Sequence, residues 1–165
     1  MSEPIDYRKI ISCSPFRIFI REGYKIPNRK LLDELGLSSY LYFPDIDKIR
    51  LGDYPNRYLY ILEQQSWKQL IDDPSYGVWH TSELRPGIER LGKEFDILYC
   101  SIGDCDESFD FVYYEKGELR RKLIVDSPNY VDRVIREDIG IPFEFEEEAF
   151  QQKSIQKLFT DVTHE

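Results

Sequence analysis

The densest group of possible metal ligands in the sequence is the acidic run Asp104-Cys105-Asp106-Glu107. Its carboxylates could bind Mg²⁺ or Ca²⁺, because both ions prefer oxygen ligands. The run is not an EF-hand loop, since the glycine and the final glutamate of that motif are not at their positions. The alternative is an exposed turn, where aspartate is favoured because its side chain hydrogen-bonds to nearby backbone. We expect this turn, with no metal and no cofactor.

His80 is the histidine that lies among predicted structural elements, whereas His164 follows them. A histidine acts as a general base when a partner lies within hydrogen-bond reach. Trp79, Thr81 and Ser82 surround His80, and no motif identifies a nucleophile, a phosphate loop, a zinc site or a dinucleotide site. We therefore expect residues 79–82 to lead into a helix beside a half-buried tryptophan, and we assign no catalytic residue.

The three cysteines, Cys13, Cys100 and Cys105, do not have the spacing of a metal site. An odd number of cysteines, with no signal peptide at the start of the sequence, predicts reduced thiols in the cytoplasm. Cys100 is expected in a strand as a small buried hydrophobe. The carboxylates beside Cys105 should raise its thiol pKa and lower its reactivity.

A second acidic group alternates with two phenylalanines near residue 145. If a helix begins there, the positive end of the helix dipole accounts for the acidic residues without a partner. Alternatively, the phenylalanines anchor a basic protein surface while the charge speeds the encounter. The candidate partner-binding residues from both acidic groups are Phe143, Phe145, Glu146, Glu147, Glu148, Asp104, Asp106 and Glu107.

The charge of the chain limits the classes of partner. The net charge is −9 and the pI is about 4.8, which argues against nucleic acid and anionic membranes as partners because both require clustered Lys and Arg. A cationic protein is compatible with this charge. No apolar run approaches the roughly 20 residues that cross a bilayer. The 165 residues fit a single domain, 1–165.

The N-terminal half predicts short strands and helices in alternation. Strands are expected at Phe16–Glu22, Tyr40–Phe43 and Arg57–Glu63, with a loop at 45–56. A helix is expected from Asn28 to its stop at Gly36, and a second from Ser66 to Ile71 with Gln69 in a capping box. A third should begin at Thr81 or Ser82 and carry Leu84, Ile88 and Leu91 at helical spacing, with Pro86 in its first turn.

The clearest pattern is an antiparallel meander of Ile97–Ile102, Phe109–Tyr114 and Leu119–Val125. A two-residue loop at Lys116-Gly117 would pair Tyr113 with Arg120. A three-residue loop with a glycine bulge would pair Asp110 with Lys122, and we favour this register because it joins opposite charges.

The last part of the sequence is less regular. Residues 130–139 fit a helix or a strand, and Gly140 with Pro142 interrupts the chain. A C-terminal helix is expected at Glu146–Asp161, with acidic residues in its first turn.

One stretch resembles a known class of proteins. The run Gly103–Phe109, then Tyr113–Leu119 with Arg121, and the later Ile139–Pro142 with Glu144 resemble a hairpin of small uncharacterised bacterial proteins, some of which are similar to immunity partners of secreted toxins. The resemblance covers about a quarter of the chain and consists of turn residues and strand alternation. It implies an immunity-like inhibitor and carries over no catalytic residue.

These patterns together predict an α+β fold in which an antiparallel β-meander packs with several short helices and a C-terminal helix. The predicted function is a non-enzymatic protein-interaction domain, immunity-like, that inhibits a basic protein. The alternative is a metal-assisted hydrolase that uses Asp104, Asp106 and Glu107, with His80 nearby.

Overall fold

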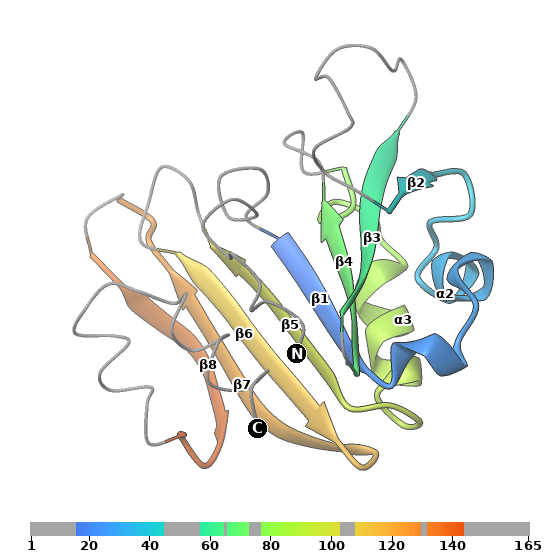
Figure 1. The fold of residues 1–165 in the computed structure, drawn as a ribbon. Coiled ribbons are helices and arrows are strands. Elements are labelled where there is room, and N and C mark those ends of the chain that lie inside the picture. Colours follow the sequence, from blue (N-terminus) through green and yellow to red (C-terminus); the bar gives the residue numbers. More distant parts are fainter. Residues whose placement is uncertain are drawn as a thin grey trace.

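The computed structural model describes residues 16–44, 57–64, 66–72, 77–102, 108–129 and 132–143, which form strands, two α-helices and one 3-10 helix. In chain order the elements are β1 (Phe16–Arg21), the 3-10 helix η1 (Gly23–Lys25), α2 (Asn28–Glu34), β2 (Leu41–Phe43), β3 (Tyr58–Gln64), β4 (Trp67–Asp72), α3 (Leu84–Leu91), β5 (Ile97–Ile102), β6 (Phe109–Glu115), β7 (Glu118–Asp126) and β8 (Val134–Gly140) (Figure 1).

The strands form one 8-stranded sheet in the order β2-β3-β4-β1-β5-β6-β7-β8 (Figure 1). All neighbouring strands are antiparallel except β2 and β3, which are parallel, so the sheet is mixed. The first strand of the described residues, β1, lies between β4 and β5. Pairing of segments that are distant in sequence therefore joins the two halves of the sheet.

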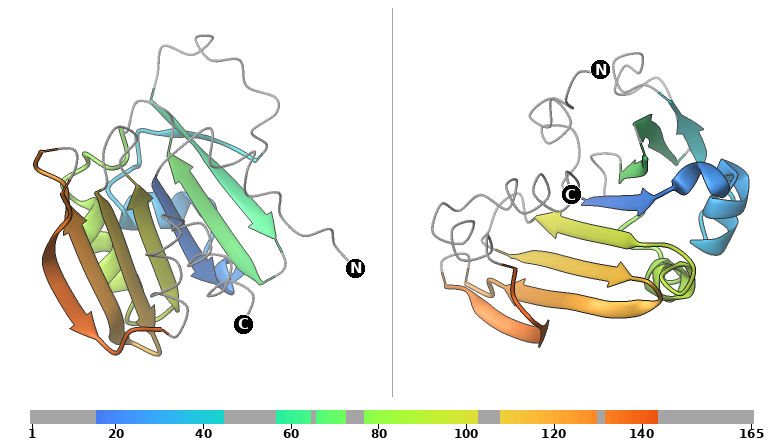
Figure 2. Two further views of the ribbon diagram at one scale, coloured as in Figure 1. Left: turned by 90° about the vertical axis from the view of Figure 1, so that its left-hand side faces the viewer. Right: turned by 60° about the horizontal axis from the view of Figure 1, so that its bottom comes forward.

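Both helices cover the same face of the sheet (Figure 2). Alternate residues of the strands point to this face, because successive side chains of a strand lie on opposite sides. The apolar stripes of the helices pack against them, which removes both surfaces from water. This core includes Phe16, Ile18 and Ile20 of β1, Leu70 of β4, Ile97 of β5, and Leu31, Leu32, Leu35, Leu84, Ile88 and Leu91 of the helices.

The opposite face of the central strands is buried as well. Phe19 of β1, Ile71 of β4, Leu98 of β5 and Phe111 of β6 are each 0% exposed. Strands buried on both faces lack the alternation of a half-exposed strand. In β4 all six residues are buried, including the polar side chains of Lys68, Gln69 and Asp72.

The predicted α+β class, with several short helices and a C-terminal helix, was wrong, because the described residues form mostly one mixed sheet. The expected helix Ser66–Ile71 is strand β4. The spacing of Trp67, Leu70 and Ile71 fits a helix because Lys68 and Gln69 between them are polar, but in the strand these two side chains are buried as well. Residues 134–140 are strand β8, and the expected helix Glu146–Asp161 lies outside the described residues.

The meander prediction was confirmed, because β5, β6 and β7 are sequential antiparallel neighbours. The favoured register was wrong, since Asp110 pairs with Ile124. Lys116 and Gly117 have φ angles of 51° and 82°, which is typical of a two-residue type I′ turn. A bulge between Tyr113 and Tyr114, opposite Arg120, then pairs Tyr113 with Arg121. The positive φ angles of Lys116 and Gly117 therefore determine the two-residue loop, and the bulge shifts the strand register by one residue.

The helices expected near Asn28 and Ser82 were confirmed as α2 and α3. They approach each other at Gly87, where a Cβ would lie 2.3 Å from the carbonyl oxygen of Glu34. Only a residue without a Cβ permits such backbone contact. Within the described part of the chain, neither helix has the length and apolar character needed to cross a lipid bilayer. The close approach brings the end of α2 beside the start of α3.

Candidate functional site

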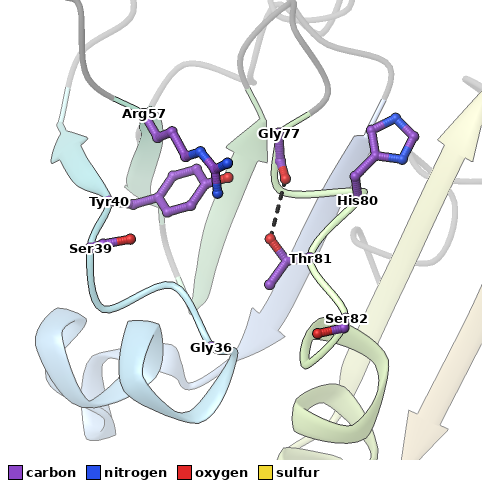
Figure 3. A pocket seen from close by; sticks show the side chains of 8 residues that line it. All are labelled: Gly36, Ser39, Tyr40, Arg57, Gly77, His80, Thr81 and Ser82. Atoms are coloured by element: carbon purple, nitrogen blue, oxygen red, sulfur yellow. Dashed lines mark hydrogen bonds between the residues drawn. The ribbon is translucent and has the colours of Figure 1, made fainter.

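A pocket of about 560 Å³ opens between the end of α2, the start of β3 and the turn before α3 (Figure 3). Its volume lies within the roughly 300–1,000 Å³ of small-molecule sites. The lining is polar, with hydroxyl groups, one guanidinium and one imidazole. The lining residues are Gly36, Ser39, Tyr40, Arg57, Gly77, His80, Thr81 and Ser82.

The first wall is the turn that follows α2. Gly36 ends the helix with a φ of +72°, a left-handed conformation that glycine adopts without strain. The Ser38 hydroxyl donates to the Asp33 carboxylate at 2.7 Å, and the Tyr40 amide donates to the Leu37 carbonyl at 2.9 Å. These bonds fix the path of residues 36–40, so Ser39 and Tyr40 reach the pocket in a defined position.

The second wall is the turn at residues 77–82, which a buried carboxylate holds in place. Asp72, at the end of β4, is 0% exposed. Its two oxygens accept the backbone N–H groups of Val78 at 3.1 Å and Trp79 at 3.0 Å. Within the turn, the Thr81 hydroxyl donates to the Gly77 carbonyl at 3.2 Å (Figure 3). The wall is therefore preformed.

Aromatic packing anchors the same turn on the sheet. The Trp79 ring meets the Phe16 ring edge-on, with centroids 5.2 Å apart. The Arg85 guanidinium carbon lies 4.2 Å from the Trp79 ring centroid, in cation–π geometry. Trp79 is half-buried, as the sequence predicted for this helix entry. The ring contacts of Trp79 and the hydrogen bonds of Asp72 together restrict the conformation of the turn.

Tyr40 and Arg57 provide the polar groups of the first wall. The Tyr40 side chain is 2% exposed, and its hydroxyl has no hydrogen-bond partner in the part of the chain that the structure describes. An unsatisfied buried hydroxyl costs about 1–3 kcal/mol. The Arg57 carbonyl accepts a hydrogen bond from the Leu41 amide at 3.0 Å. The Arg57 guanidinium forms no ion pair with any described residue. Figure 3 shows both side chains directed from the first wall toward the 77–82 turn.

The arrangement suits binding better than covalent catalysis. Within the described residues, no hydrogen bond joins His80 to the hydroxyls of Ser39, Thr81 or Ser82, whereas an activated nucleophile needs such a base. In Figure 3 the imidazole lies on the far side of the turn from Tyr40. Cys100 is buried as predicted, and burial raises the pKa of its thiol well above its usual value, which disfavours a nucleophilic thiolate.

Of the candidate residues taken from the sequence, the structure describes Phe143. Its ring is half-buried against Phe111 and Tyr113, with centroid distances of 6.1 Å and 5.9 Å. The remaining candidates, Phe145, Glu146, Glu147, Glu148, Asp104, Asp106 and Glu107, lie outside the described residues. No group of three or more metal-ligating side chains occurs in the part of the chain that the structure describes.

From the sequence, Tyr40 and Arg57 were expected only as strand residues, and Asp72 carried no signal of its own. No local pattern connects Tyr40 with Arg57, because Arg57 follows 17 positions later and the parallel pairing of β2 with β3 brings the two together. A tyrosine before a short strand carries no sign that its hydroxyl is buried.

Comparisons with known proteins do not identify the chain: no family model, no curated protein and no solved structure matches it. The pocket itself is therefore the feature of the molecule that bears on function.

Proposed function

We propose that the chain is a non-enzymatic binding domain whose recognition site is the pocket between residues 36–40, Arg57 and residues 77–82. The observation that carries the proposal is the Tyr40 hydroxyl, which is buried in the pocket lining without a partner. Buried polar groups in native proteins are nearly always hydrogen-bonded, and an exception calls for an explanation. A ligand that hydrogen-bonds to Tyr40 supplies one, and its binding requires a side chain of the lining to move, because the hydroxyl is covered in the unliganded protein.

The walls support recognition because they are fixed without a ligand. Asp72 holds one wall and the turn after α2 holds the other. Because the walls are already ordered, less conformational entropy of the protein is lost when a ligand binds. The polar lining then sets the orientation of the ligand.

The test is a screen of anionic, cationic and neutral small molecules by amide NMR shifts. We expect at least one class to shift the amides of Ser39, Tyr40, Thr81 and Ser82. Tyr40→Phe should weaken that binding about fivefold or more, because one hydrogen bond is lost. Tyr42→Phe, a half-buried tyrosine of β2 outside the lining, is the matched control. Shifts confined to other surfaces, or equal effects of the two variants, would rule out this site.

The second candidate is the capture of a cationic protein by the acidic residues near Phe143. It is favoured by the distribution of charge, because the described residues contain equal numbers of acidic and basic side chains. The net charge of −9 therefore lies in the other segments, which include Glu146, Glu147 and Glu148. In this proposal the partner is a basic protein that the chain inhibits, as for an immunity protein. The unpaired thiol of Cys100 supports a reducing location, the cytoplasm.

Charge reversal tests the second candidate. Glu146→Lys with Glu147→Lys should abolish association with a basic protein captured by the wild-type chain and should relieve any inhibition of it. Glu89→Lys with Glu94→Lys makes the same charge change at two exposed positions of the described surface. Equal loss in both double variants would indicate only a general charge effect. Thermal stability should change by a few degrees or less in either case.

A further inference from the structure

We infer that the group that enters the pocket is a phosphate monoester, an inference that rests on the pocket being the recognition site. The lining residues of the described chain include one arginine and no acidic residue. An arginine fork matches the oxygens of phosphate or carboxylate and forms charge-assisted hydrogen bonds. The charge of the lining thus favours an anion.

The lining also carries hydroxyl groups. Among the described residues the Tyr40 hydroxyl has no partner, and Ser39 and Ser82 add hydroxyls from the two walls. The Thr81 hydroxyl already donates to Gly77, so it offers a ligand only acceptor capacity. A tetrahedral phosphate presents three terminal oxygens to such donors, whereas a carboxylate presents two. The number of donors favours phosphate.

The start of α3 lies beside the same wall but carries a carboxylate of its own. Its N-cap residue is Glu83, an exposed acidic side chain that makes no hydrogen bond to the helix. Ser82, which lines the pocket, directly precedes this N-cap (Figure 3). The Leu84 amide already donates to the Thr81 carbonyl, and Pro86 has no amide hydrogen. The attraction for an anion therefore comes from Arg57 and the hydroxyl groups of the lining.

Three nearby carboxylates of the described chain are engaged elsewhere, whereas Glu83, beside Ser82, is exposed at the N-cap of α3. Asp72 accepts two backbone amides, Asp33 accepts the Ser38 hydroxyl, and Glu34 pairs with Arg90 at 3.4 Å. None of these three neutralises the guanidinium of Arg57. The pocket of about 560 Å³ is larger than a phosphate group requires, so it leaves room for part of the molecule attached to the phosphate.

The experiment is an amide NMR titration with methyl phosphate, the smallest stable monoester, at constant ionic strength. Acetate and methanol are the carboxylate and neutral probes. We expect methyl phosphate to shift the amides of Ser39, Tyr40, Thr81 and Ser82 and to bind at least tenfold more tightly than acetate. Arg57→Gln should weaken methyl phosphate binding about tenfold or more, because a charge-assisted bond is lost.

Arg120→Gln is the matched control, because it removes the same charge from an exposed arginine on β7. It should change the affinity less than about twofold. No shift at the lining with methyl phosphate, acetate binding as tightly, or equal losses in the two arginine variants would overturn the inference. If the wider screen then maps another class of compound to the same amides, the recognition site stands and only the ligand class is wrong.

Two further probes separate the possible sources of the phosphate. Adenosine 5′-monophosphate is compared with adenosine, and a phosphoserine tripeptide is compared with its serine form. Tighter binding of adenosine 5′-monophosphate than of methyl phosphate identifies a free nucleotide as the source. Tighter binding of the phosphoserine tripeptide identifies a modified protein. Binding of both unphosphorylated forms with unchanged affinity would overturn the inference.

Discussion

The buried carboxylate of Asp72 accepts the backbone N–H of Val78 at 3.1 Å and so connects the end of β4 to the turn that forms one wall of the pocket. The second oxygen accepts Trp79 in the same way. A single side chain of the sheet therefore sets the position of Thr81 and Ser82, although it does not line the pocket.

Asp72→Asn should lower the free energy of unfolding by about 1.5–3 kcal/mol, because hydrogen bonds to a buried charged group are lost. The asparagine amide offers one acceptor oxygen and sets an NH₂ donor against the second backbone N–H. Urea unfolding measures the change. Glu94→Gln, at an exposed position, serves as the control and should stay within about 0.5 kcal/mol of wild type. An equally small effect at Asp72 would show that the wall does not depend on it.

Tyr40→Phe should leave the unliganded protein as stable as wild type or raise its free energy of unfolding by about 1 kcal/mol. The variant removes a buried hydroxyl that has no partner while keeping the ring in the core. The same change should weaken ligand binding, so stability and binding move in opposite directions. Thermal unfolding without ligand is the measurement. A loss of more than about 1 kcal/mol would mean that the hydroxyl makes a stabilising bond in the free protein.

Gly87→Ala should destabilise the protein by about 1–3 kcal/mol, although alanine is normally the better helix residue. An added Cβ would lie 2.3 Å from the Glu34 carbonyl oxygen and 3.0 Å from the Leu35 Cα, and backbone atoms must move to admit it. Chemical denaturation measures the loss. Glu89→Ala, at an exposed position of the same helix, should change stability by less than about 0.5 kcal/mol. Tolerance of alanine at both positions would contradict the close approach of the helices.

Asp110 should make stability depend on pH. Burial raises the pKa of its carboxyl from 3.8 to about 6, an effect opposed by Arg85 and Lys122 and reinforced by Glu137. Between these two values the folded state holds a proton that the unfolded state releases. The contribution of Asp110 therefore becomes less favourable as pH rises from about 4 to 6 and stays unfavourable above that window.

Asp110→Asn removes this dependence. The variant should be more stable than wild type at about pH 7.5, and the difference should shrink toward zero at about pH 4. Unfolding free energies measured across this range provide the test. Glu94→Gln controls for the loss of one negative charge. A difference that grows as pH falls would have the wrong sign and would contradict the raised pKa.

Local patterns in the sequence determined the elements whose residues interact with near neighbours. The β5–β6–β7 meander has short connections, and Lys116-Gly117 specifies its turn through two positive φ angles. Helix α3 follows from the spacing of Leu84, Ile88 and Leu91, with Pro86 confined to its first turn.

Only the tertiary structure decided the rest. β4 is a strand because β1 and β3 pair with it and both of its faces are buried, whereas the spacing of its apolar residues alone fits a helix. The pocket exists because parallel pairing of β2 with β3 sets Arg57 beside Tyr40, and because Asp72 holds a distant turn opposite them. Residue type gives the chemistry of a hydroxyl or a guanidinium, but burial and the absence of a partner arise only when segments far apart in the chain pack together.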